Sequence, residues 1–175
     1  VPSQVILMTG PPGSGKTTLA LMASVGITLE TKKPGAFLSL EMAEWQVKLT
    51  AKKMPGFELL NISKSVGMKE NVFETLRKMK PSVVIIDSIQ KWAGMDGEKT
   101  GWTKGFNTNQ KDIVDACVEF AKETMIPMIL IGHCTKGGQY IGPSHLEHEV
   151  DTHIHVKFDK EIMMRTFETG TKNRF

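Results

Sequence analysis

Short apolar runs alternate with helix-like segments along most of the chain. The strand-like runs are 5–9, 36–40, 57–62, 83–87 and 128–133. The segments with apolar residues at helical spacing are 19–27, 42–54, 72–79 and one that begins near residue 108. This alternation predicts an α/β fold in which a mostly parallel β-sheet is covered by helices on both faces. In the segment 42–54, Trp45 and Leu49 stand four residues apart and are expected to form the apolar face.

Two segments near the end of the chain follow a different pattern. Residues 151–157 and 161–168 alternate polar and apolar side chains around a short polar turn. Such alternation is typical of a β-hairpin. We therefore expect a C-terminal antiparallel hairpin beside the parallel sheet.

Composition places few limits on the function. The 175 residues are 40% hydrophobic and 23% charged, which is ordinary for one globular domain. No apolar stretch approaches a membrane span, and the first residues lack the pattern of a signal peptide, so we expect a cytoplasmic protein without a membrane partner. The net charge of +3 permits a polyanionic partner but does not demonstrate one. Cys117 and Cys134 lack a CxxC spacing and are expected to be reduced core thiols.

The first strand-like run leads into the sequence GPPGSGKTT and then into a helix-like segment. This is the strand, loop and helix context of a phosphate-binding loop, or Walker A motif. Glycines let backbone N–H groups approach a polyphosphate, and the following helix adds its positive dipole end. Lys16 is expected to reach the β- and γ-phosphates of ATP, and Thr17 to ligate Mg²⁺. The expected ATP-binding residues are Gly10, Pro11, Pro12, Gly13, Ser14, Gly15, Lys16, Thr17 and Thr18.

Three polar residues end or follow the strand-like runs that come after this loop. Asp87 ends the most strand-like run and matches a Walker B carboxylate, so that Asp87 and Thr17 together predict a Mg²⁺ site. Glu41 follows 36–40 and is a candidate general base for the attacking water; alternatively, it caps the next helix. His133 ends 128–133 and is a candidate γ-phosphate sensor; alternatively, it is a buried histidine with satisfied hydrogen bonds. Five histidines lie between 133 and 155, but their spacing does not match a metal site, and we expect solvated or core histidines.

Two glycine-rich stretches, 91–107 and 135–143, interleave aromatic residues with lysines. Rings on which bases stack, together with cations, are what single-stranded nucleic acid requires. The first stretch also carries Asp96 and Glu98, so an ordinary surface loop is an equal alternative. The candidate DNA-binding residues are Lys99, Trp102, Lys104, Phe106, Lys136 and Tyr140.

Taken together, the motifs resemble the RecA-type ATPase core of the bacterial RadA (Sms) family. The resemblance rests on GPPGSGKTT, LSLEM, VVIIDSIQ, ILIGHCTKGG, IGPSHLEHEVD and KNRF, which occur in the family's order. The LSLEM segment is also similar to DnaB-type replicative helicases. The zinc finger and protease-like domain of that family have no counterpart in these residues, which suggests a phage-type minimal form or the core of a longer protein.

The resemblance implies a RecA-like P-loop domain over residues 1–175 that uses ATP and Mg²⁺. It further implies a DNA-dependent ATPase, in a hexameric ring or a filament, that drives branch migration, strand exchange or DNA unwinding in recombination or repair. Single-stranded or branched DNA would contact the loops after Asp87 and His133. Lys172 and Arg174, in the KNRF motif, would approach ATP held by a neighbouring subunit and join the catalytic set of Lys16, Glu41, Asp87 and His133.

Two other functions remain open from the sequence. A P-loop small-molecule kinase requires an arginine-bearing lid, and neither glycine-rich stretch contains an arginine. A nucleotide-switched assembly or scaffold ATPase would hydrolyse ATP slowly and signal through its oligomer. Stimulation of turnover by single-stranded DNA distinguishes the motor from both alternatives.

Overall fold

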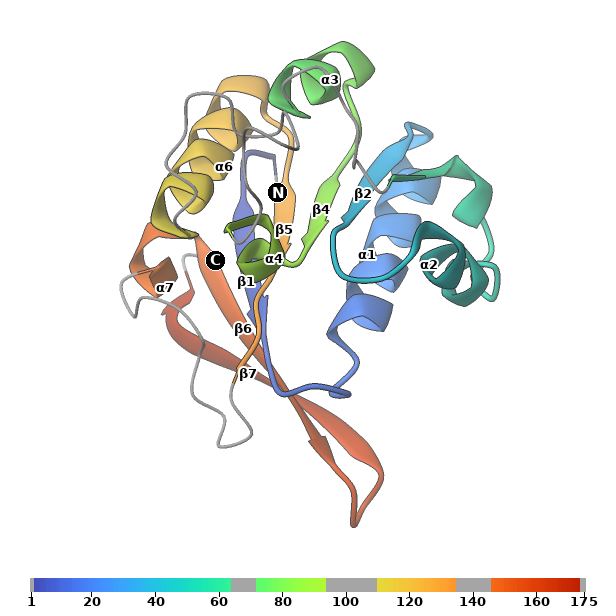
Figure 1. Cartoon of the computed structure of the whole chain (residues 1–175), viewed down its shortest axis with the longest axis vertical. Helices are drawn as coiled ribbons and strands as arrows, with labels where there is room; N and C mark the ends of the chain where they lie inside the picture. Colours follow the sequence, from blue (N-terminus) through green and yellow to red (C-terminus); the bar gives the residue numbers. More distant parts are fainter. Residues whose placement is uncertain (1, 64–71, 94–109, 135–145, 174–175) are drawn as a thin grey trace.

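One sheet organises the computed structural model, with its seven described strands in the order β3-β2-β4-β5-β1-β6-β7 (Figure 1). The structure describes residues 2–63, 72–93, 110–134 and 146–173. The strands are β1 (Val5–Thr9), β2 (Gly35–Ser39), β3 (Leu60–Ser63), β4 (Val84–Asp87), β5 (Met128–Ile131), β6 (Thr152–Asp159) and β7 (Met164–Asn173). The helices are α1 (Lys16–Thr31), α2 (Glu44–Ala51), the 3₁₀ turn η1 (Phe57–Leu59), α3 (Val72–Met79), α4 (Ile89–Ala93), α6 (Gln110–Thr124) and α7 (Leu146–Glu149).

The first six strands run parallel to one another, and β7 is antiparallel to β6. In the register of the sheet, Asp87 at the end of β4 lies between Ser39 of β2 and Ile131 of β5. The carboxyl ends of these strands therefore meet at one edge, which is where α/β sheets bind ligands. The prediction of a mostly parallel sheet with a C-terminal antiparallel hairpin is confirmed.

Alternate residues of the strands supply two hydrophobic clusters, one on each face of the sheet. Val84 and Ile86 of β4 belong to the cluster that packs against α3, α4 and α6, whereas Ile85 belongs to the cluster under α1 and α2. Figure 1 shows α1 and α2 on one side of the strands and α6 on the other. Burial of both sheet faces explains why the strands read as continuous apolar runs.

Two details of the apolar pattern were predicted wrongly. Trp45 and Leu49 are 66% and 58% exposed, and the buried residues of α2 are Val47 and Ala51. Trp92 was expected to stand in a glycine-rich loop, but it lies in α4 and is only 1% exposed. Its ring packs 5.9 Å from that of Phe73, so it is a core residue.

The observed bounds of several elements also differ from the predicted ones. The helix expected over 42–54 spans only Glu44–Ala51, and the run 57–62 divides into η1 and β3. The hairpin strands are longer and later than expected, at Thr152–Asp159 and Met164–Asn173. In Figure 1 the turn of this hairpin extends beyond the rest of the molecule.

Candidate functional site

The predicted phosphate loop connects β1 to α1 at the carboxyl edge of the sheet. Gly15 has a φ of 100° and immediately precedes the first helical residue, Lys16. A Cβ on Gly10 would stand 2.3 Å from the carbonyl oxygen of Val156, so only glycine fits where β6 approaches the loop. The Ser14 hydroxyl is buried and has no hydrogen-bond partner within the described part of the chain. An orphaned donor in such a loop fits the oxygen of a bound phosphate.

Lys16 is buried in this loop. Its Nζ donates hydrogen bonds to the carbonyl oxygens of Gly10, at 2.8 Å, and Pro11, at 2.9 Å. Burial lowers the pKa of Lys16, against the opposing effect of nearby carboxylates led by Asp87. A phosphate beside the ammonium group would offset this loss of solvation, so the cation is placed for an anionic ligand.

Thr17 and Asp87 meet across the start of α1 and the end of β4. The Thr17 hydroxyl donates a 2.7 Å hydrogen bond to Oδ2 of Asp87, whose side chain is buried. Burial is the largest cause of the raised pKa of Asp87, and the hydrogen bond from Thr17 works against it. A hydroxyl and a carboxylate are hard oxygen donors of the kind that Mg²⁺ prefers. The pair therefore fits the Mg²⁺ site expected from the sequence.

The raised pKa of Asp87 leads to a stability prediction for nucleotide-free, metal-free protein. The folded state holds the Asp87 proton more tightly than the unfolded chain does, so the wild-type chain loses stability as pH rises through the ordinary and then the raised pKa. Asp87→Asn removes this loss, and its thermal midpoint is expected to exceed that of the wild type at pH 8, with the difference closing toward pH 4.

Thermal unfolding across pH measures this effect. Asp115→Asn is the matched control, because Asp115 is an exposed carboxylate paired with Lys111 on α6. A midpoint for Asp87→Asn that stays at or below that of the wild type at pH 8 contradicts the prediction.

Glu41 and His133 form a second pair at the same edge. Nε2 of His133 lies 2.7 Å from Oε2 of Glu41, and because a carboxylate only accepts, the imidazole is the donor. Glu41 follows β2 and His133 follows β5, on either side of β4. Ligand atoms of Glu41, Asp87 and His133 all lie within 4.8 Å of one another. The parallel sheet thus brings together residues that are 92 positions apart in the sequence.

The remaining predicted site residues divide into two groups. Within the loop, Pro12, Gly13 and Thr18 are exposed. The other group lies outside the described residues or, for Lys172, has no described side chain: Lys99, Trp102, Lys104, Phe106, Lys136, Tyr140, Lys172 and Arg174.

Sequence reasoning missed three hydrogen bonds that support the loop. The Thr9 hydroxyl bonds Nε2 of His153 at 2.7 Å and Nδ1 of His155 at 3.0 Å, which ties the end of β1 to β6. The alternation of the two histidines on one strand face was the available signal. Nε of Arg165 donates a 3.1 Å hydrogen bond to the carbonyl oxygen of Ser14. No local pattern marks Arg165, which lies 151 residues away.

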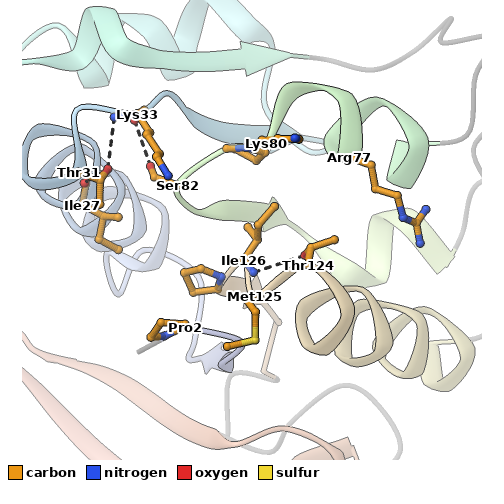
Figure 2. Close-up of a pocket in the computed structure, with 12 residues that line it drawn as sticks. Pro2, Ile27, Thr31, Lys33, Arg77, Lys80, Ser82, Thr124, Met125 and Ile126 are labelled. Atoms are coloured by element: carbon orange, nitrogen blue, oxygen red, sulfur yellow. Dashed lines mark hydrogen bonds between the residues drawn. The ribbon is translucent and has the colours of Figure 1, made fainter.

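A large groove lies elsewhere, at the opposite edge of the sheet (Figure 2). Its volume is about 920 Å³, and Pro2, Ser82 and Pro127, which line it, precede β1, β4 and β5. Figure 2 shows Lys33, Lys80 and Met125 around it, and no residue of the phosphate loop. The groove is therefore separate from the candidate nucleotide site. In the described parts of the chain, no helix has the length and apolar character needed to cross a bilayer.

Comparison with known sequences gives matches over the whole chain. Residues 1–139 match the family described as "AAA domain". The chain is 33% identical to DNA repair protein RadA of Aquifex aeolicus and 32% identical to that of Mycobacterium tuberculosis strain H37Rv, over 100% of its own length. It covers 38% and 36% of these two relatives, so it spans well under half of their length.

A solved structure supports the fold. A KaiC-like protein from Pyrococcus horikoshii superposes with a TM-score of 0.74, over 99% of this chain and 80% of that one. At 18% identity this likeness concerns the fold alone. The expected likeness to RadA and the expected RecA-type fold are both confirmed. With the loop geometry, they support a RecA-type P-loop ATPase core.

Proposed function

The chain belongs to the AAA domain family, and from this premise we propose that residues 1–175 form the ATPase core of a DNA-dependent motor. The motor would act in recombination or repair, by branch migration, strand exchange or DNA unwinding. The similarity to DNA repair proteins named RadA supports this process. The observation that carries the proposal is the convergence of Lys16, Thr17, Asp87, Glu41 and His133 at one edge of the sheet.

In the proposed site, the phosphate loop binds the polyphosphate of ATP. The backbone N–H groups of the loop's non-proline residues and the start of α1 supply donors and a positive potential, and the Lys16 ammonium adds a charge. Thr17 and Asp87 would hold Mg²⁺, which when bound neutralises charge on the β- and γ-phosphates.

Glu41 is the proposed general base. Its carboxylate is 40% exposed, so water can reach it, and it stands beside Asp87 without being buried like it. The hydrogen bond from His133 fixes the orientation of the carboxylate. Glu41 would take a proton from the attacking water, and His133 would register the departure of the γ-phosphate to the segment that follows β5.

The final cations are proposed to act on a neighbouring subunit. Asn173 pairs with Thr152, and Thr152 pairs with Ile6 near the start of β1. The chain therefore leaves β7 at the amino edge of the sheet, whereas the phosphate loop follows β1 at the carboxyl edge. This separation supports a role in trans for Lys172 and Arg174 within a homo-oligomeric ring or filament.

Turnover with and without DNA tests the proposed function. Single-stranded DNA is expected to raise the ATPase rate several-fold, with the glycine-rich stretches expected from the sequence, within 91–107 and 135–143, as the proposed contact segments. Substituting Lys99, Lys104 and Lys136 with alanine should remove the stimulation while the basal rate remains.

Two results contradict the motor. A slow rate that DNA does not change, together with an oligomer mass that depends on nucleotide, favours the switched assembly ATPase. A rate that rises only with a small phosphate acceptor favours a kinase.

A further inference from the structure

Both strands of the β6–β7 hairpin contact the phosphate loop of their own chain. On β6, the carbonyl oxygen of Val156 lies so close to Gly10 that a Cβ on residue 10 would stand 2.3 Å from this oxygen. On β7, Arg165 donates from Nε to the carbonyl oxygen of Ser14, at 3.1 Å. The hairpin therefore meets the loop near its first glycine and again near its last.

Arg165 contacts both an aromatic ring of its own hairpin and the last glycine of the loop. Its guanidinium carbon lies 4.7 Å from the ring centroid of Phe158, which is also its cross-strand partner. A Cβ on Gly15 would stand 2.8 Å from Nε of the same arginine. The aromatic ring and the close approach to the glycine thus hold the planar guanidinium group against the loop.

This contact has a chemical consequence inside the loop. The carbonyl of Ser14 and the N–H of Gly15 belong to one peptide group. A cationic donor on the carbonyl oxygen polarises that group, which makes its N–H a stronger donor at the other end. In a loop that binds phosphate through its N–H groups, Arg165 would strengthen phosphate binding without contacting the nucleotide.

The geometry points to Arg165 as a positioning residue of the nucleotide site, acting from β7 on the Ser14–Gly15 peptide of the same chain. This inference rests on the proposed function. It also gives β7 a second role, because the same strand leads from Arg165, past an irregularity in its pairing between Thr169 and Asn173, to the proposed trans-acting cations. Nucleotide binding in one chain would thereby influence Lys172 and Arg174, which are proposed to act on the nucleotide site of the neighbouring chain.

Arg165→Met tests this role, because methionine keeps an apolar stem against Phe158 and removes the charge and the donors. The Kd values of ADP and ATP, measured by calorimetry, are expected to rise together by about tenfold, since the affected peptide serves the loop and not the γ-phosphate. Arg165→Lys should recover most of the affinity. Lys157→Met is the matched control, because Lys157 lies on the same hairpin and pairs with Glu168. It should leave both Kd values within about twofold of the wild type.

The Hill coefficient of turnover adds a readout that a structural role would not move. The Hill coefficient is expected to fall toward one in Arg165→Met, because the phosphate loop is then no longer coupled to Lys172 and Arg174 at the C-terminal end. Three results overturn the inference: unchanged Kd values with a lowered thermal midpoint, a loss for ATP without a loss for ADP, or no recovery in Arg165→Lys. Failure of the proposed function gives a different result, since the wild-type chain itself would then show no ATP binding or an ATPase rate that single-stranded DNA does not change.

Discussion

Arg174→Ala is expected to lower kcat by a factor of about 10³–10⁵, while the Kd for ATP stays within about twofold of the wild-type value. The reason is the charge that develops on the transferring phosphoryl group, which an inserted arginine stabilises in the transition state only. A group that acts only there changes kcat and leaves ground-state binding alone.

The direction of β7 explains why this arginine should act in trans. Arg165, near the start of the strand, touches the chain's own phosphate loop, and Asn173, at its end, pairs with the first residue of β6. Because Arg165 pairs with Phe158 and Asn173 pairs with Thr152, the two residues are separated by six residues of β6, about 20 Å at the usual rise of an extended strand. The end of β7, which leads to Arg174, therefore lies far from the phosphate loop of its own chain.

Arg77→Ala is the matched control for this prediction. Arg77 is an exposed arginine that pairs with Glu123 at 2.6 Å, and it lies away from the carboxyl edge. Its removal should leave kcat within about twofold of the wild type. If Arg174→Ala raised the Kd for ATP by as much as it lowered kcat, the arginine would be a binding residue and the assignment would be wrong.

Glu41→Gln is the second large effect, with an expected loss of about 10²–10⁴ in kcat and a nearly unchanged Kd for ATP. Glutamine keeps the size of the side chain and an acceptor for His133, but it cannot take the proton of the attacking water. The loss in kcat therefore measures the contribution of Glu41 as the proposed base, separately from its hydrogen bond with His133.

Single-turnover hydrolysis measures this loss directly, because it excludes product release. Glu44→Gln provides the control, since Glu44 is an exposed carboxylate on nearby α2 that pairs with Lys48. It should turn over at the wild-type rate. Wild-type hydrolysis by Glu41→Gln would show that another group activates the water.

The parts of the site that follow from the sequence are those set by local chemistry or by parallel strands. The phosphate loop is one continuous motif between β1 and α1, so its place at the edge of the sheet and the side chains that it supplies follow from the sequence. The pairing of Glu41 with His133 spans 92 residues, yet it follows from the rule that parallel strands end at a common edge. The approach of Thr17 to Asp87 follows for the same reason.

The errors came from features that periodicity does not encode. Trp45 and Leu49 do share one face of α2, but Val47 and Ala51 share another face at the same spacing, and this second face is the buried one. The smaller pair allows α2 to lie close to α1, and that close approach leaves the larger pair in solvent. Arg165 could not be found because its contact depends on how far the hairpin extends past the sheet edge.

Mixing two inactive variants is the most direct test of the account, which holds that each nucleotide site is completed by an adjacent chain. Arg174→Ala keeps Glu41, and Glu41→Ala keeps the arginine, so a site between the two chains can be whole. With random assembly in equal amounts, about a quarter of the sites regain both groups, and the ATPase rate should approach about a quarter of the wild-type value. If the rate stayed at the level of the separate variants at every mixing ratio, the shared site would be contradicted.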